Sequence, residues 1–315
     1  MVAGTAGHHA EEDRMRIAAF GDNIVDRFVD RRIAYPGGNC VNVAVFAAGE
    51  GAEALYMGVV GDDDNGTLIL DALEACRVDT SFVQRRHGPT GVTDMETRDG
   101  DRVFLTWNDG GVTTSDPYRL DEESLAALAP MALVHSSVYS ASESELPALR
   151  RLDGLVTFDY SSEPEFRTDA YLARTAPYAD LVLFSGGDEP EAALLELMGR
   201  ALGHGPRLAL ATRGAAGALL TDGSWVLREP AVEVPAAELV DTTGCGDAFL
   251  AAFVLSLLRA GWDRDGLPSP ADCRRALAAG ARRAARQCHV AGAFGMGVSY
   301  VRDDDRSVLS RSEDH

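Results

Sequence analysis

Short apolar runs alternate with amphipathic stretches along most of the chain. The runs predict buried β-strands, and the stretches between them carry apolar positions at helical spacing. The predicted strands cover residues 16–22, 53–61, 132–138, 154–161, 180–186 and 207–214, and the predicted helices cover 65–78, 143–152, 189–202 and 248–258. This alternation is typical of βαβ units, so we expect a three-layer α/β/α sandwich with a mainly parallel central sheet.

Two stretches depart from the alternation. Residues 91–107 have period-two character around the turn RDGDR and predict an antiparallel hairpin. We expect residues 89–110 to join residues 24–36 in a small β-sheet lid above the main domain, which spans residues 16–300. A second hairpin is predicted around Asp222 and Gly223. The leader (1–15) and the tail (301–315) are expected to be disordered and flexible, respectively.

Composition narrows the class of function. The chain has 315 residues, a hydrophobic fraction of 46%, a formal net charge of −20 and a pI near 4.7. The negative charge argues against non-specific binding to nucleic acid or to anionic membranes and favours work on small molecules. The sequence contains no lysine, which excludes a P-loop lysine and Schiff-base chemistry.

The cysteines and the apolar runs indicate a cytoplasmic protein. The five cysteines are scattered and lack CxxC spacing, so they do not form a disulfide framework. No apolar run has the length of a membrane span, and the acidic leader lacks the apolar core of a signal peptide.

The stretch DTTGCGDAFLAAF, residues 241–253, carries the most specific chemistry. Its glycines precede the predicted apolar helix, where free N–H groups and the helix dipole attract anions. Asp247, in the first turn, could accept a proton from a hydroxyl that attacks a phosphate. Alternatively, residues 241–243 only cap the helix and Asp247 is a favourable first-turn acid.

Residues 241–249 resemble the second signature of the ribokinase (PfkB-type) carbohydrate kinases, usually D-T-x-G-A-G-D-x-F. The resemblance implies that Asp247 is the catalytic base and that Gly244, Cys245 and Gly246 form an anion hole. Cys245 replaces the usual alanine. Because the hole uses backbone N–H groups, we expect the replacement to be tolerated, although it places an oxidisable thiol beside the reaction centre.

Residues 35–66 resemble the first signature of the same family. The resemblance implies that Gly37, Gly38 and Asn42 hold the sugar, and that Asp26 binds sugar hydroxyls. Without the resemblance, the glycines would predict only a turn before a helix, with Asn42 exposed.

The same resemblance extends to the nucleotide side and implies ATP and Mg²⁺ as cofactors. The residues assigned to the nucleotide are Thr212, Gly214, Gly217, Thr242 and Gly292. Family members commonly carry N-x-x-E after a strand to hold Mg²⁺ through water. The segment SGGDE here aligns Ser185 and Asp188 with that motif, which makes Asp188 the candidate metal residue and leaves Glu189 as an alternative. Activation by a monovalent cation stays open.

Among family members, the sequence looks most like bacterial fructoselysine 6-kinases, which phosphorylate O6 of an Amadori compound. Glu96 could pair with the cationic amine of such a substrate and Arg102 with its carboxylate, although both could equally be solvated residues of a hairpin.

A free sugar such as fructose or 2-keto-3-deoxygluconate is the alternative substrate. A catalytically silent sugar or nucleotide sensor is the alternative from another class. Family members commonly form homodimers through the lid, and this sequence leaves that point open.

Overall fold

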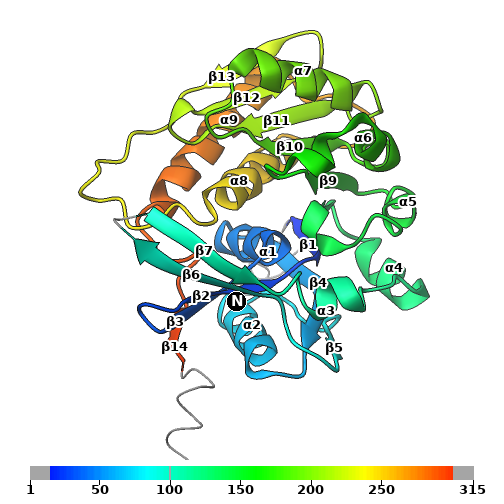
Figure 1. Ribbon diagram of the computed structural model, residues 1–315. Coiled ribbons are helices and arrows are strands. Elements are labelled where there is room, and N and C mark those ends of the chain that lie inside the picture. Colours follow the sequence, from blue (N-terminus) through cyan, green and yellow to red (C-terminus); the bar gives the residue numbers. More distant parts are fainter. Residues whose placement is uncertain (1–14, 99–100, 301–315) are drawn as a thin grey trace, which may run out of the picture.

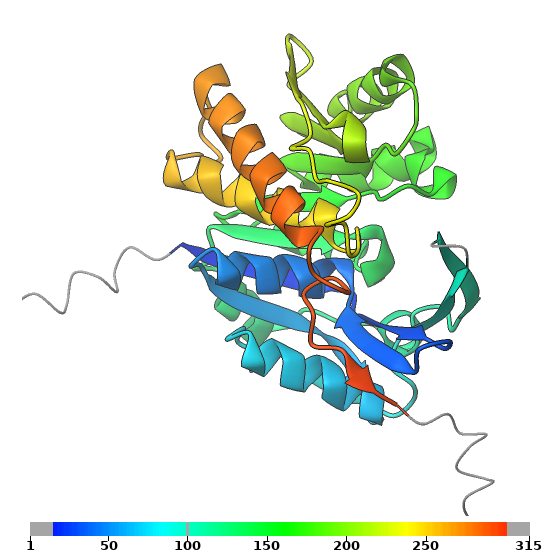
Figure 2. The same ribbon diagram turned by 90° about the vertical axis from the view of Figure 1, so that its left-hand side faces the viewer.

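The computed structural model describes residues 15–98 and 101–300 of the chain. The predicted leader, apart from Met15, and the predicted tail lie outside the described residues. Two sheets organise the rest: a nine-stranded sheet through the centre and a five-stranded sheet beside it (Figures 1 and 2).

The large sheet is mainly parallel. Its strand order is β13 (Val226–Glu229), β12 (Ala218–Thr221), β11 (Leu208–Thr212), β10 (Leu181–Ser185), β9 (Leu155–Asp159), β8 (Leu133–Ser137), β1 (Arg16–Gly21), β4 (Glu53–Gly61) and β5 (Gln84–Arg86). Only the β11–β12 and β12–β13 pairs are antiparallel, and the second of them is the hairpin predicted at Asp222.

Helices cover both faces of the large sheet (Figures 1 and 2). One face packs on α1 (Asn39–Gly49), α2 (Asp64–Ala75), α8 (Cys245–Arg259) and α9 (Pro270–Gln287). The other packs on α3 (Val112–Ser115), α4 (Glu122–Leu128), α5 (Leu146–Leu149), α6 (Asp169–Thr175) and α7 (Glu191–Leu202). Along β1, Ile17 and Ala19 belong to the first core and Ala18 and Phe20 to the second, because successive strand residues point to opposite faces. The predicted three-layer sandwich is confirmed.

The predicted helix at 143–152 is much shorter in the structure. Residues 142–145 form a turn in which the Glu145 N–H donates to the Ser142 carbonyl at 2.9 Å. Pro147 then lies in the first turn of α5, where its missing N–H costs nothing, and α5 ends at Leu149.

The small sheet has the order β14 (Val298–Ser299), β3 (Ile33–Gly37), β2 (Ile24–Phe28), β6 (Val92–Arg98) and β7 (Asp101–Trp107). Both segments that were predicted to form the lid, residues 24–36 and 89–110, contribute to it, and β14 adds a short edge that the sequence did not reveal. The register between β6 and β7 shifts after Asp94, which leaves Leu105 without a partner. Because of this bulge, Phe104 (opposite Met95) and Trp107 (opposite Thr93) lie on one face.

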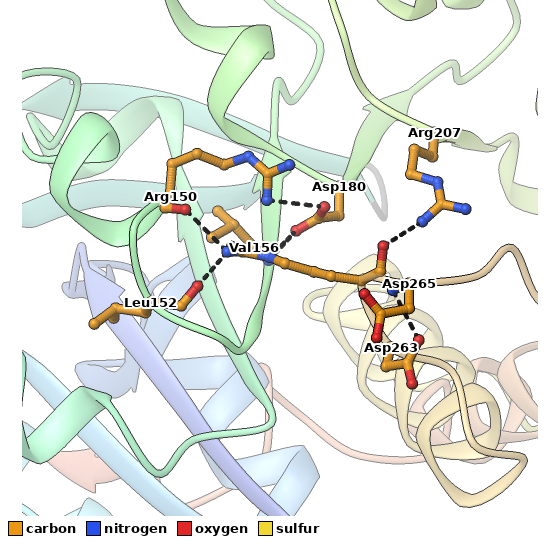
Figure 3. Close-up of polar contacts among 8 residues, drawn as sticks. Arg150, Leu152, Val156, Asp180, Arg207, Asp263 and Asp265 are labelled. Atoms are coloured by element: carbon orange, nitrogen blue, oxygen red, sulfur yellow. Dashed lines mark hydrogen bonds and ion pairs between the residues drawn. The ribbon is translucent and has the colours of Figure 1, made fainter.

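An ion network fastens the amino ends of β9 and β10, at the edge of the large sheet opposite the strand ends that bind ligands in such folds (Figure 3). The buried Asp180 carboxylate accepts from the Val156 N–H at 2.8 Å and lies 3.3 Å from both Arg150 and Arg264. Arg207 donates to the Arg264 carbonyl at 2.6 Å. These contacts tie the loop after α8 to the sheet.

Within residues 15–98 and 101–300, every helix is too short or too polar to cross a lipid bilayer.

Candidate active site

The glycine turn brings α8 to the carboxyl end of the large sheet. Gly244 precedes the helix with φ 74°, and a Cβ there would lie 3.0 Å from the Ala293 Cα. Both the positive φ and the close approach to Ala293 require glycine at this position. The Cys245 N–H donates to the Thr242 carbonyl at 3.3 Å. The N–H groups of Gly246 and Asp247, in the first turn of α8, have no acceptor within the helix and are available to an anion.

Asp247 is half-buried and is held by two amides. The Asn39 Nδ2 donates to its Oδ1 at 2.8 Å, and the Asn42 Nδ2 donates to its Oδ2 at 2.7 Å. Burial raises the pKa of Asp247 well above its usual range, and the charges of Asp159 and Asp22 raise it further against the lowering effect of Asn42. A carboxylate with a raised pKa is a better proton acceptor near neutral pH.

The structure brings the predicted sugar residues together. A Cβ on Gly37 would lie 3.6 Å from the Asn42 Oδ1 and 4.0 Å from the Asp26 Oδ2, so the three residues converge. Asn42 is only 5% exposed, which excludes the alternative of an exposed side chain. Its Oδ1 has no hydrogen-bond partner among the described residues. A buried acceptor without a partner suits a hydroxyl donor from a ligand.

Close packing places the amino end of α1 at this site. Gly38 has φ 111°, and a Cβ there would lie 2.6 Å from the Asn23 Cα. The buried Asp22 accepts from the backbone N–H groups of Asn39 at 2.6 Å and Cys40 at 3.3 Å, and thereby caps a helix that has no side-chain cap of its own. This arrangement directs Asn39 and Asn42, one turn apart, at Asp247.

Sequence reasoning missed three side chains of the site: Asn39, His135 and Asp159. The Asn39 Nδ2 also donates to Asp159 at 2.7 Å, and its Oδ1 lies 2.6 Å from the His135 Nε2. His135 and Asp159 lie on the predicted strands β8 and β9, and Asp159 is the last residue of its strand. A polar residue at the carboxyl end of a buried strand could have identified Asp159 from the sequence, because ligands bind at these strand ends.

Of the predicted nucleotide residues, Thr212 lies beside the glycine turn. A Cβ on Gly246 would lie 3.9 Å from the Thr212 Oγ1, so Thr212 adjoins the helix start. Thr242 is exposed, and the space around Gly214 is open. Gly217 and Gly292 have a packing role: a Cβ would come 2.0 Å from the Glu229 carbonyl oxygen and 2.5 Å from the Tyr35 ring, respectively.

Two of the candidate substrate residues, Asp26 and Glu96, lie on opposite faces of the small sheet. Asp26 pairs with Thr93, and Arg27 with Asp94. Glu96 is two residues beyond Asp94 and therefore lies on the face opposite Asp26. The backbone of Arg102 belongs to β7, but its side chain lies outside the described residues.

The candidate metal residue is a single exposed carboxylate. Asp188 lies in the loop after β10 and is exposed, whereas Glu189 is engaged by Arg167. In the described ranges, no three His, Cys, Asp or Glu side chains are grouped so as to hold a metal ion. One carboxylate still suits Mg²⁺, which keeps several waters and binds substrate phosphates.

Comparison with known proteins defines the class. Residues 29–293 match the model of the pfkB family of carbohydrate kinases. The chain is 36% identical over 296 residues to the fructosamine kinase FrlD of Bacillus subtilis, covering 93% of this chain and 98% of that protein. It is 33% identical over 279 residues to a fructoselysine 6-kinase of Escherichia coli, covering 88% and 99%.

The fold agrees with this class. The structure of Arabidopsis thaliana ribokinase, solved with ribose and ATP, superposes with a TM-score of 0.72 at 18% identity and covers 94% of this chain and 98% of that one. The chain belongs to the pfkB carbohydrate kinase family, and it is a phosphotransferase with a sugar hydroxyl as acceptor.

Proposed function

We propose that the protein transfers the γ-phosphoryl group of ATP to O6 of a fructosamine, with fructoselysine or a close analogue as the substrate. The observation that carries this proposal is the position of Asp247. It lies at the amino end of α8, where the side-chain amides of Asn39 and Asn42 donate to it. Asn42 in turn lies beside Gly37 and Asp26. One carboxylate thus adjoins both an anion site and a hydroxyl site.

On the sugar side, Asn42 Oδ1 accepts a hydrogen bond from a sugar hydroxyl and so completes its hydrogen bonding. Asp26, beside Gly37, accepts from further hydroxyls. Gly38 lets the chain before α1 pack directly on the Asn23 backbone, which holds the amino end of α1 beside the small sheet.

On the phosphate side, bound Mg·ATP supplies the phosphoryl group and the metal that compensates its charge. The Gly246 and Asp247 N–H groups stabilise the negative charge that develops on the transferred group. Asp247 accepts the proton of the attacking hydroxyl. The residues that would border the nucleotide are Thr212, Gly214, Gly217, Thr242 and Gly292. Asp188 would hold the metal through water.

Two observations support a fructosamine over a free sugar. The first is the similarity to the fructosamine and fructoselysine kinases over nearly their full lengths. The second is the face of the small sheet that carries Asp26, where Trp107 is 53% and Phe104 70% exposed. Aromatic rings attract an ammonium group and an alkyl chain, and a fructosamine carries both beyond its sugar. Asp94 is already neutralised by Arg27 at 2.6 Å and is a poor partner for that amine.

ADP release from Mg·ATP, measured with fructoselysine, other fructosamines, fructose, 2-keto-3-deoxygluconate, ribose and adenosine, tests the proposal. We expect the highest kcat/KM for an amine-bearing ketose. The Asp247→Asn variant should lose at least about 10³-fold in kcat while it still binds the sugar in calorimetry. A near-normal rate in this variant would refute the role of Asp247. Preference for a free sugar would overturn the fructosamine assignment, and binding without turnover by the wild type would indicate a sensor.

A further inference from the structure

A single amide bridges two carboxylates beside the candidate base. The Asn39 Nδ2 lies 2.7 Å from the Asp159 Oδ2 and 2.8 Å from the Asp247 Oδ1. Asn39 is the first residue of α1, Asp159 is the last of β9 and Asp247 is in the first turn of α8. Three distant segments of the chain therefore meet at one NH₂ group.

Every hydrogen bond in this group has a defined direction. Ionised carboxylates only accept, so the NH₂ end of Asn39 must face them, and its Oδ1 must accept from the His135 Nε2–H at 2.6 Å. The other ring nitrogen of His135 then accepts from the Thr157 hydroxyl at 2.9 Å. Burial lowers the pKa of His135 to about 3, which keeps this ring neutral. The histidine therefore fixes the orientation of the amide.

We propose that Asp159 is a positioning residue of the transfer reaction: through the Asn39 amide, it holds the Asp247 carboxylate in place and keeps a second negative charge beside it. The inference rests on the proposed role of Asp247 as the base. Nothing in the sequence signatures assigns a part to Asp159, which is 4% exposed and has no cationic partner among the residues that the structure describes.

The charges that act on Asp247 are of one sign. Asp159 at the end of β9 and Asp22 after β1 are both negative, His135 on β8 is neutral, and burial keeps the Cys245 thiol on α8 protonated. Burial raises the pKa of Asp159 itself to about 6. When Asp247 takes up the proton of the sugar hydroxyl, its repulsion with Asp159 disappears. The second carboxylate therefore makes Asp247 a stronger base than burial alone would.

The Asp159→Asn variant tests the inference because it removes the charge and keeps the shape. Activity is lost as the pH falls through the pKa of the base. Without the negative neighbour that pKa is lower, so the acid limb of kcat against pH should move down by about one unit. At pH 8, kcat should fall about three- to tenfold because the base is weaker, whereas the sugar KM should change less than about twofold.

Two controls separate positioning from general damage. Asp180→Asn removes another buried carboxylate, at the opposite edge of the sheet (Figure 3), and should lower the thermal unfolding temperature without moving the acid limb. His135→Leu frees the Asn39 amide and should lower kcat, and His135→Gln, which retains an N–H donor, should restore much of it.

An acid limb that stays in place in a folded, active Asp159→Asn enzyme would overturn the inference. A uniform loss of kcat at every pH would do the same, because it would indicate a merely structural role. If the wild type transfers phosphate to no substrate of the panel, the proposed function itself fails. This outcome is distinct from any result with the variants, because it concerns the unchanged protein.

Discussion

At the scale of the residue, Asn42 can link the proposed catalytic base to the proposed sugar site. Its Nδ2 donates to Asp247 at 2.7 Å, and its Oδ1, without a partner in the described part of the chain, lies beside Gly37 of the proposed sugar site. Replacement by aspartate would put a third carboxylate beside Asp247 and Asp159. We therefore expect position 42 to need both the Nδ2 donor and the Oδ1 acceptor of asparagine.

Cys245 replaces the alanine that is usual at this position, and a second cysteine lies beside it. Its Sγ lies 3.5 Å from the Sγ of Cys288, which caps the carboxyl end of α9. Burial and the adjacent sulfur raise the pKa of the Cys245 thiol, so its thiolate is scarce at neutral pH. The thiol should thus react slowly with oxidants, and faster as the pH rises.

We expect diamide, which takes up two hydrogens from a pair of thiols, to join Cys245 and Cys288 in a disulfide that lowers kcat and that dithiothreitol reverses. Peptide mass mapping identifies the bond. Cys288→Ser should prevent both the bond and the loss of activity. Cys245→Ala should keep kcat within about threefold, since the proposed anion site uses backbone N–H groups. Equal inactivation of the Cys288→Ser variant would exclude this pair as the target.

At the scale of the element, the first turn of α8 contributes both to the packing of the fold and to the proposed anion site. The helix is apolar on nearly all sides because it packs between α9, α1 and the sheet. Its start is fixed by Gly244, whose φ of 74° and close approach to Ala293 place the free N–H groups at the strand ends.

The Gly244→Ala variant should lose about 1–3 kcal/mol of unfolding free energy, because alanine is strained at this φ, and its kcat should fall because the turn must move away from Ala293. Denaturant unfolding and steady-state kinetics measure the two effects. Gly261→Ala is the matched control. Gly261 follows the same helix with φ 87° and has open space around it, so its replacement should cost stability and spare kcat. A normal kcat in Gly244→Ala would show that the turn tolerates displacement.

At the scale of the whole molecule, the two sheets define the two sides of the site. The large sheet supplies the rigid ends of β1, β8, β9 and β11, and the small sheet lies beside it (Figure 2). Asp26 lies on β2 of the small sheet. Trp107 lies two strands away from Asp26 on the same face, about 10 Å at the usual strand spacing. This distance suits a group attached to the far end of a sugar.

We expect Trp107→Ala to raise the KM for fructoselysine about three- to tenfold through the loss of contact with the ammonium and alkyl groups, and to leave the KM for fructose within about twofold. Val103→Ala on the same strand is the control, since Val103 pairs with Glu96 on the opposite face. If Trp107→Ala instead raises both KM values alike and converts a dimer to a monomer in size-exclusion chromatography, the aromatic face is a contact between two copies of the chain.

The sequence by itself determined the fold class, most strands of both sheets and the glycine turn with Asp247. These features are local: apolar periodicity, turn residues and contiguous motifs specify them within a few tens of residues. The sequence could also group Gly37 with Asn42, which are five residues apart.

Only the tertiary structure decided which polar groups meet. Asn39, His135 and Asp159 come from three elements, and nothing in their spacing indicates that one amide would bridge two carboxylates. Likewise, the face on which Glu96 and Trp107 lie depends on strand register and on one bulge at Leu105. Such contacts arise where distant segments pack together, and a single residue of register reverses the face that a side chain occupies.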